Sequence, residues 1–229
     1  MIVDPPILSI RAKFQRPERK IVEAFAGVPT GHAVDAMGGS GAIDYRIKAL
    51  QLSEKVMVGV ALTCSAGPAD NLAVFGALSA AKPGDILVVA AGGYAGTAVT
   101  GDLLLGMARN CGVVGFVTDG MVRDIVGILE VGLPVYCAGV TANSPARSGP
   151  GTVGEPVDLG GVRIDSGDIL IGDRDGVVVV PRGKAPQILE ALAAVRTAES
   201  ALEAKVKGGL RIPDFVLEIL KSSRVRSLD

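Results

Sequence analysis

Two apolar runs separated by one helix length constrain the fold of this chain more than any other feature. The first run spans Ile86–Ala91 and stops at Gly92-Gly93, and the second spans Val113–Val117 and stops at Thr118-Asp119-Gly120. Between them, apolar residues recur with the period of an α-helix, at Leu103, Leu104, Met107, Ala108 and Cys111. The stretch therefore predicts a strand, a glycine loop, a helix, a second strand and a second loop.

Both loops are expected to open into one site, because ligands of open α/β sheets bind beyond the carboxyl ends of the strands. The first loop leads through Gly101 into a helix whose N-terminal N–H groups favour an anion. The second loop delivers Arg123-Asp124, a guanidinium beside a carboxylate. An acidic substrate and a cation are the ligands that these two loops predict.

The remaining segments continue the alternation of strands and helices, which favours a βαβ core. Strand patterns cover Val56–Thr63 and Val135–Ala138, and helix patterns cover Asn71–Ala81 and Ile125–Val131. Residues 162–180 contain three apolar runs separated by turns at Asp165–Asp168 and Asp173–Gly176, which predict an antiparallel meander. We therefore expect an α/β fold, a single layered α/β/β/α-type domain with a mixed sheet and glycine-rich central loops.

The whole chain, residues 1–229, is predicted to form one domain. Residues 1–40 form its helical N-terminal segment, in which Thr30 is the expected N-cap of a second helix. The α/β core covers residues 41–183, and residues 184–229 form a helical C-terminal extension, with helices at Ala185–Lys207 and Pro213–Leu220.

Composition excludes several classes of function. The formal net charge is −1, which gives no basic patch for nucleic acid, and no long apolar run predicts a membrane span or a leader, so we expect a soluble, cytoplasmic protein. A single histidine, His32, cannot form a multi-histidine metal site within one chain. Lysine is missing from Pro83 to Gly183, which argues against a Schiff-base aldolase because that mechanism needs a lysine in the site.

The pair Arg123-Asp124 has two interpretations. Taken alone, it is more typical of a solvated helix start in which Asp124 caps the following helix. Asp102 on the facing loop favours the second interpretation, because two carboxylates in one crevice repel each other unless a cation lies near them. Mg²⁺ needs only one or two carboxylates and keeps several waters, which leaves coordination positions for a 2-oxo acid.

Asp102, followed after twenty intervening residues by Arg123-Asp124, resembles the motif of the class II 4-hydroxy-4-methyl-2-oxoglutarate/4-carboxy-4-hydroxy-2-oxoadipate aldolases. These enzymes share a family with the regulator of ribonuclease activity A. The similarity extends from about Thr30 to the Gly172–Pro181 segment. Residues Arg182–Asp229 are similar to the helical C-terminal extension of the aldolases, which the shorter ribonuclease regulators lack.

The resemblance implies a role for each residue of the motif. Backbone N–H groups of Gly101, Asp102, Leu103 and Leu104 would bind pyruvate, and Arg123 would bind its carbonyl or carboxylate side. Asp124 would ligate Mg²⁺ or Mn²⁺ directly or through water, and Asp102 would position a water that protonates the enolate. Some family members have an acidic residue where this chain has Gly127. Glu199 of a neighbouring subunit is a candidate acidic contribution, although a solvated helix face also explains it.

The predicted activity is a metal-dependent retro-aldol cleavage that releases pyruvate, accompanied by decarboxylation of oxaloacetate. A non-enzymatic protein-binding regulator of ribonuclease on the same fold is the alternative, and a lyase for a different 2-oxo acid is a third possibility. Few aromatic residues and a surplus of apolar positions on the Ala185–Lys207 helix predict a homo-oligomer. The resemblance implies trimers or pairs of trimers, with the site at a subunit boundary.

Overall fold

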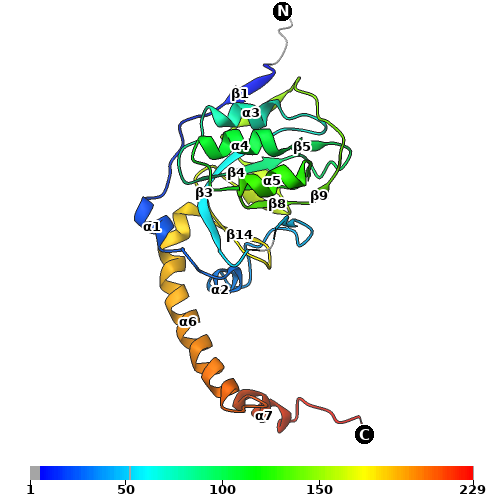
Figure 1. The fold of residues 1–229 in the computed structure, drawn as a ribbon. Coiled ribbons are helices and arrows are strands. Elements are labelled where there is room, and N and C mark those ends of the chain that lie inside the picture. Colours follow the sequence, from blue (N-terminus) through cyan, green and yellow to red (C-terminus); the bar gives the residue numbers. More distant parts are fainter. Residues whose placement is uncertain (1–5, 52, 229) are drawn as a thin grey trace, which may run out of the picture. The chain divides into compact units, whose positions relative to one another are not determined.

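The computed structural model describes residues 6–51 and 53–228, and it confirms the α/β fold (Figure 1). The chain divides into two compact units, Met1–Leu192 and Ala193–Asp229. The helices are α1 (Arg19–Glu23), α2 (Thr30–Ala36), α3 (Leu72–Leu78), α4 (Asp102–Asn110), α5 (Ile125–Val131), α6 (Ala185–Lys207) and α7 (Asp214–Leu220), with a 3-10 turn at Arg182–Lys184.

A nine-stranded mixed sheet forms the centre of the first unit. Its parallel middle consists of β3 (Met57–Ser65), β4 (Asp85–Ala90), β6 (Gly115–Thr118) and β8 (Val135–Cys137), in that order. The outer strands are β1 (Leu8–Ile10), β10 (Gly151–Val153), β2 (Lys48–Ala49), β13 (Ile169–Gly172) and β14 (Val177–Val180). Every residue of β4 and β6 is buried, which explains why these strands are continuous apolar runs in the sequence.

Alternate residues of the central strands enter two different cores. Leu87 and Val89 of β4 pack with α3, α4 and α5 on one face of the sheet. Ile86 and Val88 face the other way, into a second core completed by residues of β14 and of the hairpin of β11 (Val157–Leu159) and β12 (Val162–Ile164). A third core joins the outer face of β13 and β14 to α2, near the N-terminus, and to the first residues of α6. These cores produce the predicted α/β/β/α layering.

Two local predictions were wrong. Residues 162–180 contain the three expected strands, but they do not form one meander, because β12 pairs with β11 whereas β13 pairs with β14 and β3. Thr30 is not an N-cap but the first residue of α2. Its N–H and its hydroxyl both donate to Asp173, at 2.8 and 2.7 Å, so a distant carboxylate caps the helix.

The second unit begins inside α6. This helix buries Ala185, Ile188 and Leu192, and none of its described residues after Leu192 is buried. An ion pair joins Lys207 to Glu203, one helical turn earlier. Within the described ranges, no helix combines the length and the apolar character that crossing a bilayer requires.

Candidate functional site

A small parallel sheet, which the sequence analysis missed, aligns the two predicted loops. It consists of β5 (Ala98–Thr100), β7 (Met121–Val122) and β9 (Gly139–Val140), each of which follows a central strand along the chain. Thr100 pairs with Val122, and the Arg123 N–H donates to the Thr100 carbonyl at 3.1 Å. The register therefore sets Gly101, at the start of α4, beside Arg123-Asp124.

Asp119 fixes the glycine loop at the end of β4. One of its carboxylate oxygens accepts the N–H of Ala91 at 2.6 Å, and the other accepts the N–H of Gly93 at 2.9 Å. Gly92 and Gly93 both have positive φ, a conformation that glycine adopts without steric cost. This loop is thus held by the loop after β6, and Asp119 supports the site without lining it.

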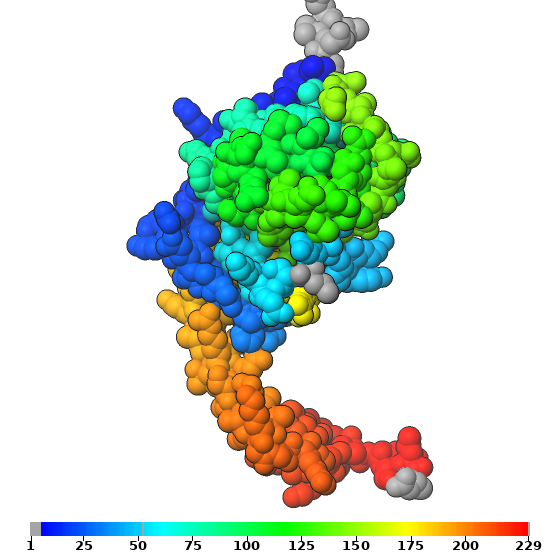
Figure 2. Space-filling model, viewed as in Figure 1, coloured from blue at the N-terminus to red at the C-terminus, as the bar shows by residue number. Residues whose placement is uncertain are grey.

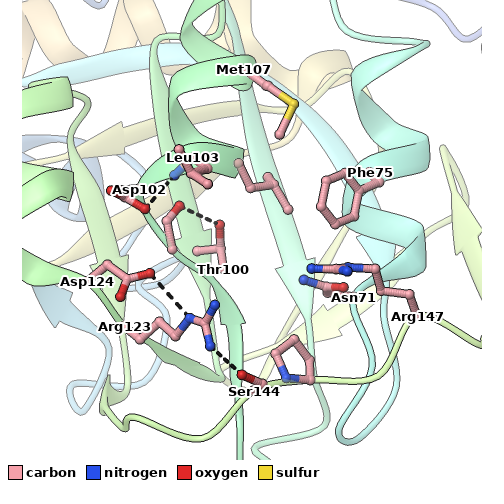
Figure 3. Close-up of a pocket in the computed structure, with 13 residues that line it drawn as sticks. Asn71, Phe75, Thr100, Asp102, Leu103, Met107, Arg123, Asp124, Ser144 and Arg147 are labelled. Carbon is pink, nitrogen blue, oxygen red and sulfur yellow. Dashed lines mark hydrogen bonds and ion pairs between the residues drawn. The ribbon is translucent and has the colours of Figure 1, made fainter.

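The pocket between these loops gathers all six residues that the resemblance assigned within one subunit (Figure 3). The lining consists of Asn71, Phe75, Thr100, Gly101, Asp102, Leu103, Leu104, Met107, Arg123, Asp124, Ser144, Pro145 and Arg147. The first turn of α4 faces this space, and N–H groups of a first turn have no backbone carbonyl partners within their helix. Glu199 lies in the second unit, is exposed and is not part of the lining.

Asp124 adopts a left-handed backbone conformation, with φ 61° and ψ 47°. Such a conformation costs a non-glycine residue of order 1 kcal/mol and is common at functional sites. Asp124 occupies the N-cap position of α5, yet its side chain makes no capping hydrogen bond, so the capping interpretation was wrong. Its Oδ2 instead lies 3.2 Å from Nε of Arg123, and the other end of the guanidinium donates to Oγ of Ser144.

Two glycines make room for the two carboxylates. A Cβ at Gly101 would collide with the carboxylate of Asp124. A Cβ at Gly127, on α5, would lie 2.6 Å from Cβ and 2.8 Å from Cγ of Asp102. The Asp102 side chain thus occupies the space above Gly127, and its Oδ1 also accepts the N–H of Leu103 at 2.7 Å. An acidic side chain at position 127 would compete with Asp102 for this space.

A loop anchored by Asp70 closes the far side of the pocket. The Asp70 carboxylate accepts the N–H groups of Leu72, Ser148 and Gly149 at 2.8, 2.6 and 3.0 Å. Burial raises the pKa of Asp70, but these three donors together outweigh it and leave the pKa below its ordinary value. The loop between Ala142 and Gly149, which carries Ser144 and Arg147, is therefore held at the base of α3.

Sequence reasoning missed Asn71, Ser144 and Arg147. Asn71 was assigned to a helix, and the other two lie in a segment that was predicted only as loop. Spacing along the chain gave no signal for them, because non-local hydrogen bonds bring that loop to the pocket. The N–H of Asn71 donates to the Ala146 carbonyl at 3.0 Å, and the Ala146 N–H donates to the Ala69 carbonyl at 2.7 Å.

The chemistry of the pocket fits a hard divalent cation. Among the described residues, no cluster of three or more histidine, cysteine or acidic side chains could hold a metal. Asp102 and Asp124 supply carboxylate oxygens, which suit Mg²⁺ or Mn²⁺, and Mg²⁺ is normally held by one or two carboxylates with waters or substrate. Asp124 engages Arg123 through Oδ2, which leaves Oδ1 for a cation or a water on one.

Sequence comparison matches this chain to one family model and to two similar proteins. A family model described as "RraA-like: Aldolase/RraA" matches residues 30–179. A protein of Halalkalibacterium halodurans named "Putative 4-hydroxy-4-methyl-2-oxoglutarate aldolase" is 38% identical over 173 residues, which cover 76% of this chain and 82% of the relative. An uncharacterized protein of Methanocaldococcus jannaschii is 31% identical over 172 residues, 74% of this chain and 82% of that one.

Two solved structures of RraA proteins are similar to this chain in fold and in sequence. Streptomyces coelicolor RraAS2, described as an unusual member of the RNase ES inhibitor RraA protein family, superposes with a TM-score of 0.75 at 31% identity, covering 83% of this chain and 99% of that chain. The RNA-processing inhibitor RraA of Thermus thermophilis gives a TM-score of 0.62 at 28% identity, covering 67% and 93%. The matched family model spans more than half of the chain, and this protein therefore belongs to the RraA-like family.

Proposed function

We propose that this protein is a divalent-metal-dependent lyase that cleaves 4-hydroxy-4-methyl-2-oxoglutarate or 4-carboxy-4-hydroxy-2-oxoadipate to pyruvate and a second 2-oxo acid. Decarboxylation of oxaloacetate accompanies this activity, because it passes through the same enolate. One observation carries the proposal: a single pocket brings together the N-terminus of α4, the Arg123 guanidinium and the carboxylates of Asp102 and Asp124. The family's aldolase relative supports it.

The pyruvate half of the substrate binds at the start of α4. Backbone N–H groups of residues 101–104 receive its carboxylate, helped by the positive end of the helix dipole, and the Leu103 N–H exchanges Oδ1 of Asp102 for a substrate oxygen. Arg123 lies against the keto oxygen, where a guanidinium stabilises the negative charge that develops as the enolate forms. Its bond to Ser144 and its contact with Asp124 hold it in place before the substrate arrives.

A divalent cation, Mg²⁺ or Mn²⁺, would be held by Asp124 and supplies positive charge beside the oxygens of the 2-oxo acid. The remaining residues account for the movement of protons. When the C3–C4 bond breaks, its electron pair stays on C3, and the C4 hydroxyl becomes a carbonyl by passing its proton to the water that Asp102 holds. Asp102 holds a water that delivers a proton to C3 and so completes the pyruvate methyl group.

A Schiff-base route has no residue to carry it here, since none of the thirteen lining side chains is a lysine. Incubation with excess EDTA should abolish pyruvate release from either substrate, and Mg²⁺ or Mn²⁺ should restore it. Borohydride trapping of a substrate adduct on the protein, or full activity in EDTA, would overturn the proposal.

A protein-binding regulator is the second candidate, because RraAS2 is described as a member of an RNase ES inhibitor family and the Thermus RraA as an RNA-processing inhibitor. The pyruvate assay separates the two. A regulator would release no pyruvate from any 4-hydroxy-2-oxo acid and would tolerate replacement of Asp102, for which binding a protein offers no evident need.

We also propose a homo-oligomer, a trimer or a pair of trimers, with the pocket close to a subunit boundary. Exposed apolar side chains on α4 and α5 support this, with Leu103 78% and Val126 74% exposed. These two helices, drawn in green, make up much of one face of the first unit (Figure 2). Glu199 of a neighbouring subunit is proposed to reach this site. Light scattering that shows a fully active monomer at assay concentration would refute the shared site.

A further inference from the structure

We propose that Arg147 binds a second carboxylate of the substrate, and that Asn71 positions its guanidinium. This inference rests on the proposed lyase activity and assigns the residues that recognise the carboxylate on C4, which both proposed substrates carry. Arg147 and Asn71 line the side of the pocket opposite Asp102 and Asp124 (Figure 3). A substrate whose pyruvate half binds at α4 therefore extends its C4 substituents toward them.

The backbone on both sides of Arg147 is fixed. Ala146 exchanges hydrogen bonds with Ala69 and Asn71, and the N–H groups of Ser148 and Gly149 donate to the buried carboxylate of Asp70. The guanidinium carbon lies 5.3 Å from the centre of the Phe75 ring. An aromatic face attracts a cation and leaves the N–H edge of the guanidinium open to a carboxylate. Main-chain hydrogen bonds on both sides therefore hold the backbone of Arg147 in place beside the pocket.

The charged residues of the pocket leave the Arg147 guanidinium available to pair with a substrate carboxylate. Its charged lining residues are two aspartates and two arginines. Arg123 is already engaged with Asp124, whereas no carboxylate among the described residues forms an ion pair with Arg147. The charges of the four side chains sum to zero, and so do those of a divalent cation and the two carboxylates of 4-hydroxy-4-methyl-2-oxoglutarate. A substrate with one carboxylate would leave the loaded site with an excess positive charge.

Asn71 supplies an independent observation. It is only 5% exposed, and its Nδ2 donates to the Val99 carbonyl at 3.2 Å, which identifies the other amide atom as the oxygen. That oxygen is buried and accepts no hydrogen bond from any described residue. An unsatisfied buried acceptor is costly, so we expect the Arg147 guanidinium to turn toward this oxygen when the ligand binds. A guanidinium has five N–H groups, enough to serve Asn71 and a carboxylate together.

The test compares two substrates that differ only at C4. One is 4-hydroxy-4-methyl-2-oxoglutarate, and the other is 4-hydroxy-2-oxopentanoate, which has no carboxylate there. Arg147→Met keeps most of the aliphatic length over Phe75 and removes the charge. It should raise KM for the first substrate about 10- to 100-fold, as expected for a lost charged hydrogen-bonded pair, and leave kcat/KM for the second within about twofold.

Arg147→Lys should recover only part of the loss, because it keeps the charge without the fork. Asn71→Asp would place a carboxylate against Arg147 and should weaken the first substrate selectively. Arg174→Met, which removes an exposed arginine paired with Glu54, is the matched control and should change neither substrate. An equal loss on both substrates with Arg147→Met, or no loss on either, would overturn the inference alone. Wild-type protein that releases pyruvate from neither would overturn the proposed lyase function together with it.

Discussion

Adding one methyl group at Gly127 should destabilise the protein and slow the proposed reaction, although alanine favours a helix. The new Cβ would lie 2.6 Å from Cβ and 2.8 Å from Cγ of Asp102, where carbon atoms normally stay about 3.5–4.0 Å apart. A side-chain rotation moves Cγ but not Cβ, so α4 and α5 must separate by about 1 Å. Overpacking of this kind costs about 1–3 kcal/mol, which offsets or exceeds the roughly 1 kcal/mol gained in helix propensity.

Two further variants isolate that contact. Gly106→Ala, also between α4 and α5, would bring its Cβ no closer than 3.9 Å to Val131, so it should stabilise by about 1 kcal/mol. The three atoms nearest to a Cβ at Gly127 all belong to the Asp102 side chain. In an Asp102→Gly background, Gly127→Ala should therefore also stabilise by about 1 kcal/mol. Urea unfolding of the wild type, Gly127→Ala, Asp102→Gly and the double variant measures the coupling, about 2 kcal/mol.

The same substitution displaces the carboxylate that is proposed to hold the proton-delivering water. A shift of about 1 Å in a catalytic group can cost about 10²-fold in rate, so kcat for pyruvate release should fall by that order. If Gly127→Ala is as stable as Gly106→Ala and retains the wild-type kcat, Asp102 does not occupy the space above Gly127 and the reasoning fails.

Three other substitutions probe single groups. Arg123→Lys should lower kcat/KM by roughly 10²-fold or more with little change in Tm, because lysine cannot reproduce the fork; wild-type kinetics would reduce Arg123 to a helix-start charge. Asp102→Asn should still bind Mg²⁺ and pyruvate but turn over about 10²–10⁴-fold more slowly, and weaker Mg²⁺ binding with a rate that excess Mg²⁺ restores would make Asp102 a ligand. Asp70→Asn should lower the free energy of unfolding at neutral pH by about 1.5–3 kcal/mol. Because the folded pKa of Asp70 lies below its ordinary value of 3.8, its contribution is present above that value and is lost as the pH falls through the folded pKa. The difference between variant and wild type should therefore shrink in acid, and a pH-independent difference would contradict this assignment.

The central part of the fold could be predicted because its signals are local. Buried parallel strands are continuous apolar runs, and α4 and α5 have helical spacing between glycines, so both loops of the site followed from pattern and from the geometry of parallel sheets. The motif resemblance then located Gly101–Leu104 and Arg123-Asp124, all of which line one pocket.

What the sequence could not provide depends on pairing between distant segments. Strands β5, β7 and β9 have only two or three residues each, too few for any periodic signal. The hairpin of β11 and β12 and the pairing of β13 with β3 are equally compatible with the alternation that suggested a meander. Asp173 lies far along the chain from Thr30, whose N–H it accepts at the start of α2, and no local rule joins them.

The buried carboxylate of Asp70 anchors the Ala142–Gly149 loop, so substrate specificity can change in evolution without a loss of folding. Asp70 accepts hydrogen bonds from main-chain N–H groups of this loop, and these bonds do not depend on which side chains the loop carries. Exposed positions between Asn143 and Arg147 can therefore be exchanged without disturbing the sheet cores. Asp102, Arg123 and Asp124, the residues proposed for chemistry, lie instead at strand ends and helix starts, where the neighbouring residues are fixed by the sheet and the helices. A library randomised at Arg147 should thus yield mostly folded proteins with altered substrate preference, and variation among natural relatives should concentrate in the same loop.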